Sequence, residues 1–292
     1  LCLTNSIPLV WITETTVRTR SQIIDAEKLP SLRRMKRQTG NFLEEKGFQK
    51  SIIKATSAQC NGLPTYLAYK NIAQNALLFF DSRVKQNLLV TEDEIRTKQK
   101  YLDQGLPLRL VFSGRLTEIK GVEFLLDVAK ELNRQSIPFR LDIYGDGNLK
   151  SKLESEVSRL DLDSKVQLHG VLDFQTELVP TLKQSADIFL CCHLQGDPSC
   201  TYLETLACGI PIIGFSNEAW QGLYEMTQAG WLVEIGNSTQ MAASVVLIHQ
   251  QRSLWLQAAL AALQFAEHNT FEMTMTRRVE HLQQYSKSRV NN

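Results

Sequence analysis

The sequence lacks the patterns that mark several common classes of protein. It has no GxGxxG followed by an acidic residue, no CxxC pair, and no DxD or HxxxH pattern that offers a metal site. No apolar run is long enough to span a membrane, and the opening LCLTNSIPLVWI lacks the basic start of a signal peptide. These absences argue against a nicotinamide-dependent oxidoreductase. Measured binding of a nicotinamide cofactor would support that class instead. They also predict that the chain has no metal site.

Charge and cysteine content narrow the class further. A formal net charge of +1 over 292 residues gives no reason to expect nucleic acid as the main partner. The cysteines show no framework spacing and several lie in apolar runs, which is typical of reduced, buried thiols in a cytoplasmic protein. They are Cys2, Cys60, Cys191, Cys192, Cys200 and Cys208.

One local run of charge stands out near the N-terminus. Arg33, Arg34, Lys36 and Arg37 lie within five positions of one another. They could contact anionic lipid or an anionic polymer, but a solvated helix face is the favoured interpretation. Peripheral contact with the inner face of a membrane therefore stays open as a partner prediction.

Strands and helices alternate regularly from Pro107 onward. Apolar runs predict strands at 108–114, 139–147, 166–168, 186–192 and 210–215, with helices at 121–135, 149–160 and 176–184 between them. This alternation predicts an α/β fold with a doubly wound parallel sheet, whose ligands bind beyond the carboxyl ends of the strands. Before Pro107 the signals are sparser: a strand within 51–59, a helix from Pro64, a strand at 77–81 and a capped helix at 91–105.

The stretch DPSCTYLETLACGIPIIGF, residues 197–215, carries the strongest chemical signal. Asp197 to Ser199 suit a helix start, Gly209 its end, and the apolar run that follows suits a buried strand. Amides near Ser199, Cys200 and Thr201 are expected to be unpaired and to attract an anion such as a phosphate. Glu204 can turn toward the same crevice and accept hydrogen bonds from sugar hydroxyls, the alternative being a solvated helix residue.

A second signal is the turn GRLTEIKG after the strand at 108–114. Gly114 allows close approach of the backbone, and Arg115 and Lys120 place two cations where a diphosphate could be held. Taken alone, a solvated loop explains these residues equally well. Gly170, which follows another strand, could edge a nucleobase pocket, and its neighbour His169 is more often structural. His193 could approach a ligand, but the sequence gives it no proton-transfer role.

Taken together, GRLTEIKG, IYGDG, ADIFLCCHLQGDPS and LETLACGIPII resemble the C-terminal domain of retaining nucleotide-sugar glycosyltransferases of family four, which have the GT-B fold. The resemblance runs from about Leu108 to Val233. It implies two Rossmann-like domains with doubly wound parallel sheets. The expected divisions are a partial acceptor-side domain at 1–105, a donor-binding domain at 106–264, and a helix at 265–292 that crosses back to the first domain.

The resemblance also implies roles for individual residues. Arg115 and Lys120 would hold the donor diphosphate, and Glu204 would be the second Glu of the family's paired-glutamate motif and bind the donor ribose. The amides at Ser199 to Thr201 would meet the diphosphate or sugar. The position of the first Glu is occupied by Gly196, with Asp197 beside it. Neither the family's glycine-rich loop nor its acceptor-side histidine occurs before Pro107, so the first domain is expected to be truncated.

The expected function is therefore transfer of a sugar from a nucleotide diphosphate donor to a hydroxyl acceptor, with retention and without metal or other cofactor. The donor would be linked to UDP or GDP, and the acceptor would be a polysaccharide or a lipid-linked glycan. The alternative is a catalytically inactive subunit that binds a nucleotide sugar or acts as a scaffold. Gly196 and the short first domain motivate that alternative, and turnover of a labelled donor would separate the two.

Overall fold

A computed structural model describes residues 7–27 and 29–286. The chain divides into two compact units. Unit 1 comprises Leu1–Arg83, Gln195–Cys200 and Asn269–Asn292, and unit 2 comprises Val84–Leu194 and Thr201–His268. Cys2 lies outside the described residues. Cys60, Cys191, Cys192, Cys200 and Cys208 are free thiols.

Unit 2 is built on a sheet in which each described strand pair is parallel. Its strands are β4 (Leu108–Ser113), β5 (Phe139–Tyr144), β6 (Val166–Gly170), β7 (Ile188–Cys191), β8 (Ile212–Phe215) and β9 (Gly230–Val233). The spatial order is β6-β5-β4-β7-β8-β9, which confirms the predicted α/β fold. The chain winds outward in one direction from β4 and in the other from β7. The carboxyl ends of these two neighbours therefore flank the switch point where such sheets bind ligands.

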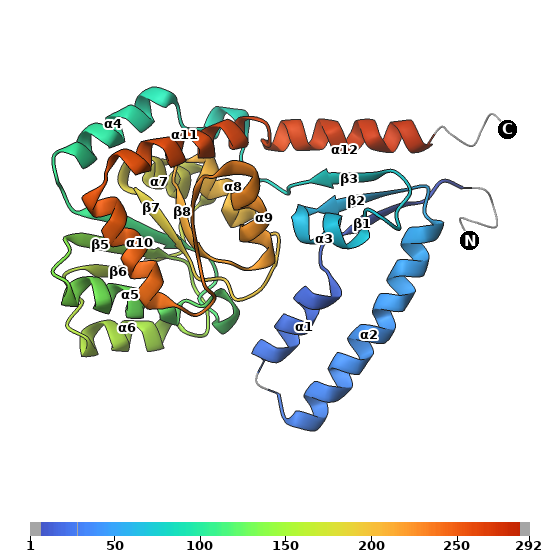
Figure 1. The fold of residues 1–292 in the computed structure, drawn as a ribbon, viewed down its shortest axis with the longest axis horizontal. Helices are drawn as coiled ribbons and strands as arrows, with labels where there is room; N and C mark the ends of the chain where they lie inside the picture. Colours follow the sequence, from blue (N-terminus) through green and yellow to red (C-terminus); the bar gives the residue numbers. More distant parts are fainter. Residues whose placement is uncertain (1–6, 28, 287–292) are drawn as a thin grey trace. The chain divides into compact units, whose positions relative to one another are not determined.

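The helices of unit 2 cover both faces of this sheet. They are α4 (Glu92–Asp103), α5 (Glu123–Arg134), α6 (Lys150–Arg159), α7 (Val179–Ser185), α8 (Cys200–Ala207), α9 (Glu218–Thr227), α10 (Ser238–Gln250) and α11 (Ser253–Glu267). Helix α5 packs on α6 and α10, whereas α11 packs on α4 and α9. In Figure 1 the strands of unit 2 lie between α4 and α11 on one side and α5 and α6 on the other. The sheet is consequently buried on both faces, as its apolar strands predict.

Most predicted elements of unit 2 occur within a few residues of their expected bounds. Helix α4 begins with the predicted cap, because the Thr91 side chain accepts from the Glu94 amide and the Glu94 side chain reaches back to Thr91. The helix expected at 176–184 instead opens with a π-helical turn, Phe174–Leu178, before α7. Pro180 lies at the start of α7, where its missing N–H is tolerated.

The amino end of the sheet in unit 2 holds a buried ion pair. The guanidinium of Arg109 on β4 donates to the Asp187 carboxylate just before β7, with Nη2 2.5 Å from Oδ1. Asp187 is fully buried, its backbone oxygen accepts from the indole of Trp255, and Arg109 lies over the Tyr101 ring. This end of the sheet is stabilised by polar contacts that fix its register, at the opposite end from the switch point.

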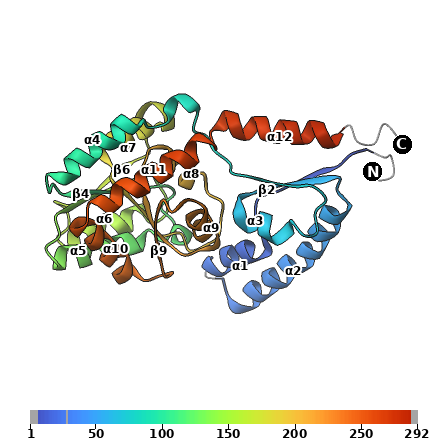
Figure 2. The same cartoon turned by 45° about the horizontal axis from the view of Figure 1, so that its top comes forward.

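Unit 1 has a smaller sheet, β1 (Val10–Thr13), β2 (Ser57–Asn61) and β3 (Ala76–Phe79), also parallel and in the order β1-β2-β3. Its helices are α1 (Val17–Ala26), α2 (Ser31–Lys54), α3 (Gly62–Tyr69) and α12 (Phe271–Ser286). Figures 1 and 2 show α1 beside α2, and α12 on the opposite side of the sheet from α1 to α3. The strand expected within 51–59 begins only at Ser57, because α2 continues without a breaker through Lys54.

The two units differ in their bounds from the division expected from sequence. Residues 84–105, expected in the first domain, group with unit 2 because α4 packs on α11. The buried Lys98 on α4 also donates to the backbone oxygens of Leu182 and Cys208. The segment 195–200 groups with unit 1, as does the C-terminal segment from Asn269, which was expected from 265.

Candidate functional site

The loops after β4, β5 and β7 meet at the carboxyl edge of the sheet in unit 2. The Gly114 amide donates to the Tyr144 oxygen at 3.0 Å, and the Leu194 amide to the Ile119 oxygen at 3.1 Å. A Cβ at Gly145 would lie 1.9 Å from the Gly114 oxygen, and at Gly121 2.1 Å from the Cys192 oxygen. Only glycine permits these approaches. The glycines therefore bring the three loops together at the switch point.

Two cations lie in the loop after β4. Arg115 is exposed, whereas Lys120, at the end of the short 3-10 turn Glu118–Lys120, is only 5% exposed. Both positive charges act on His193, which follows β7. Arg115 and Lys120 thus lie at the carboxyl end of β4, where both charges reach His193 after β7.

His193 is the least expected feature of this edge. It is completely buried, with its ring edge-on to Phe112 and to Tyr202. Burial first, and then the charges of Lys120 and Arg115, hold the pKa of His193 well below its ordinary value, so the imidazole is neutral. Neither ring nitrogen has a hydrogen-bond partner among the described residues. Buried polar atoms usually have a partner, so His193 is a candidate ligand-binding group.

The His193 backbone is held by a residue that the sequence analysis did not single out. Asn217 caps α9 by accepting from the amides of Ala219 and Trp220, and its side chain donates to the His193 oxygen at 3.0 Å. It also exchanges a hydrogen bond with the Tyr202 hydroxyl. Asn followed by Glu is a sequence pattern that predicts a helix start. The hydrogen bond from Asn217 to His193 could not be predicted, because it joins separate loops.

Glu204 lies on α8 and is 5% exposed, which removes the interpretation that it is a solvated helix residue. It is two positions from Tyr202, the residue that contacts the His193 ring. The predicted end of this helix is confirmed: Gly209 has φ +62° and its amide donates to the Leu206 oxygen at 2.9 Å. The strand β8 follows after Pro211. Glu204 is therefore fixed by a short helix between two buried strands.

Part of the predicted site belongs to unit 1. Within the segment 195–200, the Gly196 amide donates to Gln22 at 3.0 Å and the Gly196 oxygen accepts from the Thr19 hydroxyl at 3.3 Å. Asp197 accepts from the Gln195 amide group at 3.2 Å. The prediction that the Ser199 amide is unpaired was wrong, because it donates to the Asp197 oxygen at 2.7 Å. Two residues of α1 thus anchor the backbone at the position of the missing first Glu.

The remaining sequence candidates have identifiable surroundings. The Cys200 thiol lies 3.6 Å from the Asp81 carboxylate, and both residues belong to unit 1. Helix α8 begins at Cys200, and from Thr201 onward it belongs to unit 2. Gly170 has φ +76°, and its oxygen accepts from the Gly145 amide at 2.7 Å, which ties it to the loop after β5. His169 stacks on Tyr144 and contacts Asp142, so the structural interpretation of His169 is favoured.

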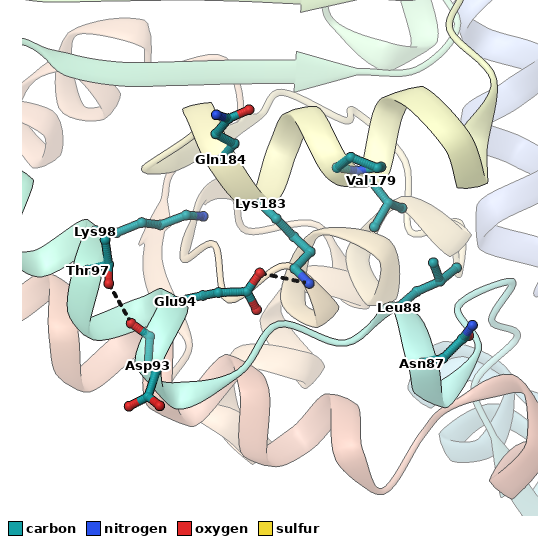
Figure 3. A pocket seen from close by; sticks show the side chains of 10 residues that line it. Asn87, Leu88, Asp93, Glu94, Thr97, Lys98, Val179, Lys183 and Gln184 are labelled. Atoms are coloured by element: carbon teal, nitrogen blue, oxygen red, sulfur yellow. Dashed lines mark hydrogen bonds and ion pairs between the residues drawn. The ribbon is translucent and has the colours of Figure 1, made fainter.

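A cavity of about 590 Å³ lies elsewhere in unit 2, between α4 and α7 (Figure 3). Its lining includes the ion pair of Glu94 with Lys183, and Lys98 extends beside Gln184. None of the residues predicted to bind the donor lines it. Across residues 7–27 and 29–286, no group of three or more His, Cys, Asp or Glu side chains could hold a metal ion. Over the same residues, no helix is both long and apolar enough to cross a membrane.

Residues 107–251 match the family described as Glycosyl transferases group 1. About half of the chain is therefore similar to this glycosyltransferase family. The match begins just before β4 and ends just after α10, so it covers the loops that carry Arg115, Lys120, His193 and Glu204.

Individual relatives agree with this family. The chain is 25% identical over 186 residues to the putative colanic acid biosynthesis glycosyltransferase WcaL of Salmonella typhimurium, covering 62% of this chain and 42% of WcaL. It is 28% identical over 212 residues to the amylovoran biosynthesis glycosyltransferase AmsK of Erwinia amylovora, covering 65% of this chain and 51% of AmsK. The chain thus spans about half the length of these curated relatives.

Solved structures confirm the GT-B fold. HepE of Anabaena, in complex with UDP, has a TM-score of 0.69 at 14% identity, covering 97% of this chain and 74% of HepE. Sucrose-phosphate synthase of Thermosynechococcus elongatus has a TM-score of 0.70 at 15% identity, covering 94% and 67%. At such low identity the likeness establishes the fold alone.

Proposed function

We propose that the chain is a retaining glycosyltransferase of family four, which moves a hexose from a nucleotide diphosphate donor to a hydroxyl acceptor. The observation that carries the proposal is the convergence of Arg115, Lys120 and the unpartnered, buried His193 at the carboxyl ends of β4 and β7. Cations and an uncharged donor group at this place suit a diphosphate. Unit 2 is then the donor-binding part, and acceptor binding belongs to unit 1.

The names of relatives indicate the substrate class. HepE was solved with UDP, and WcaL and AmsK are named for the biosynthesis of colanic acid and amylovoran. We infer a UDP- or GDP-linked sugar as donor and a polysaccharide or lipid-linked glycan as acceptor. Gly170, tied to the loop after β5, would edge the nucleobase, and the carboxylate of Glu204 would bind the ribose.

In the proposed reaction the bond between the anomeric carbon and the β-phosphate oxygen breaks, and the acceptor oxygen bonds to the same face of that carbon. Negative charge then grows on the departing diphosphate. Arg115 and Lys120 stabilise that charge without a metal, and His193, kept neutral, donates one N–H to the donor. The acceptor proton passes to the departing phosphate, which balances the charge. Asp197 and the start of α8 at Ser199, Cys200 and Thr201 would meet the donor sugar.

Turnover of labelled UDP- and GDP-sugars tests this proposal, with hydrolysis in the absence of acceptor counted as turnover. We expect Arg115→Ala to lower kcat/KM for the donor by roughly 10- to 150-fold, which corresponds to the free energy of one charge-assisted hydrogen bond. Arg134→Ala is the matched control, because Arg134 is an exposed arginine at the far end of α5. Equal activity of the two variants would contradict the diphosphate role.

Glu204→Gln separates the ribose role from a structural one. The substitution removes the charge with little change of volume, so the fold should persist while affinity for the nucleoside diphosphate falls. Affinity equal to that of the unaltered chain would remove Glu204 from the site. Circular dichroism of the variant checks that the fold is intact.

The second candidate is a catalytically inactive subunit that binds nucleotide sugar or acts as a scaffold. The observation that favours it is Gly196, which brings no carboxylate to the position of the first Glu and whose backbone is anchored by Thr19 and Gln22. Tight binding of a donor without transfer or hydrolysis would select this candidate. Turnover that is lost in Asp197→Asn would instead show that Asp197 replaces the missing Glu.

A further inference from the structure

Helix α2 of unit 1 exposes large apolar side chains along one face. Leu32, Met35, Phe42 and Leu43 are 78%, 63%, 59% and 64% exposed. Leu43 follows Leu32 by 11 residues and Phe42 follows Met35 by seven, both close to whole helical turns, so the four side chains lie within about one third of the helix circumference. We call these four residues the outer α2 face.

The opposite side of α2 is the one that packs within unit 1. Asn41 and Glu45 are buried and bind Arg20 of α1, Glu45 also accepts from the Tyr69 hydroxyl, and Ile52 belongs to the unit's core. From Asn41 onward the helix is therefore held in place without using the outer α2 face.

Basic residues accompany the outer α2 face. Within α2 there are seven Lys and Arg against two Glu, although the formal net charge of the whole chain is only +1. Arg34 and Arg37 pair with Asp25 and Glu27 of the α1 segment. The others form no ion pair with any residue that the structure describes: Arg33, Lys36, Lys46, Lys50 and Lys54.

We propose that the outer α2 face, with its unpaired basic residues, binds the surface of an anionic lipid bilayer. An interfacial helix combines large apolar side chains on one stripe with Lys and Arg that reach the headgroups, and α2 has both. A soluble polyanion would match the basic residues but leave Phe42 and Leu43 in water. The charge complementarity and the apolar stripe together favour a bilayer. This proposal does not rest on the transferase activity, since binding needs no sugar donor.

Flotation of the full chain with vesicles tests the proposal. The chain should bind vesicles that contain phosphatidylglycerol and not vesicles of phosphatidylcholine alone, and added salt should weaken binding. The double variant Phe42→Ser and Leu43→Ser should bind roughly tenfold or more weakly, from the lost apolar contact. Lys46→Glu should bind at least about fivefold more weakly. These side chains are exposed, so circular dichroism should show an unchanged fold.

Matched controls come from unit 2, where Met226 and Lys100 are likewise exposed. Met226→Ser and Lys100→Glu should bind the anionic vesicles as the unaltered chain does. Equal binding to neutral and to anionic vesicles would overturn the proposal. Binding of anionic vesicles by the Phe42 and Leu43 double variant as tight as that of the unaltered chain would also overturn it and would indicate a polyanion site. A stable dimer that dissociates in that variant would also overturn it, because a second copy would then cover the face.

Discussion

The two units bury their apolar residues to very different degrees. Unit 2 has six parallel strands sandwiched between helices, and strands such as β7 and β8 are buried at every position. Unit 1 has three strands among its described residues; Ile12 on the edge strand is 47% exposed, and the side chains of the outer α2 face are 59–78% exposed. Unit 2 therefore has the stability to support close loop contacts and a buried, unpartnered histidine. Unit 1 instead leaves large apolar side chains exposed.

The two ends of the sheet in unit 2 also differ. At the amino end Arg109 and Asp187 pair with each other, and at the carboxyl end the nitrogens of the buried His193 have no described partner. A satisfied end stabilises the fold, and an unsatisfied end is where a ligand supplies the missing contacts.

Removing the buried ion pair should damage unit 2 most. Asp187→Ala leaves Arg109 with an unmatched charge, and we expect a loss of about 3–5 kcal/mol in the free energy of unfolding. Urea denaturation followed by circular dichroism measures it. The exposed pair of Glu131 and Arg134 is the control, and Glu131→Ala should leave the transition unchanged. Similar small losses in both variants would mean that the amino end does not anchor the sheet.

Lys98 should make the stability of unit 2 depend on pH. Burial lowers the pKa of Lys98 to about 8, from 10.5. Between these values the unfolded chain holds a proton that the folded chain has released, so stability due to Lys98 rises with pH. Relative to Lys98→Met, the unaltered chain should gain at most about 3 kcal/mol from pH 7 to pH 10.5. A difference between the two proteins that stays constant with pH would show that the lysine is hydrated.

The close approach of loops at the carboxyl end should be intolerant of a single methyl group. Gly145→Ala places a Cβ against the Gly114 oxygen, which must displace the loop that carries Arg115. We expect a loss of about 1–3 kcal/mol in nucleotide affinity, the scale of local backbone strain, measured by calorimetry. Gly105→Ala also has positive φ but meets nothing, so it controls for conformational strain alone. Equal affinities would disconnect Gly145 from the site.

Unit 1 should respond in the opposite direction to an added methyl group. Gly40 and Gly47 lie inside α2, and a Cβ at either would meet nothing within 4 Å. Each Gly→Ala substitution should raise the stability of unit 1 by about 1 kcal/mol, because alanine favours the helix. Chemical denaturation followed by the fluorescence of Trp11, which packs on Phe48, measures this. A decrease in stability would show that α2 requires flexibility at these glycines.

The fold of unit 2 was largely predictable, because its strands are apolar runs separated by helices with clear caps and stops. Thr91 and Gly209 are examples in which local chemistry determines the end of an element. The strand β9 is not predictable from local sequence, since it has only four residues and begins with glycine. The start of β2 was misplaced, because the charged α2 gives no signal for its end.

The candidate site was predictable only residue by residue. Arg115 and Lys120 could be selected from their place after a strand end, and Glu204 from its place five residues after Ser199 on a helix. The state of His193 depends on Phe112, Tyr202 and two cations from other segments, which no local pattern reveals. The pairing of the Ser199 amide was missed for the same reason, because it follows from the path of the whole loop.

Calorimetric titration of the purified chain with UDP, GDP and ADP, without added metal, tests the proposed diphosphate site. We expect UDP or GDP to bind, Arg115→Ala to weaken this binding by roughly 10- to 150-fold, and Arg134→Ala to leave it unchanged. Absence of binding by all three nucleotides, or equal binding by both variants, would contradict a diphosphate site at the carboxyl ends of β4 and β7.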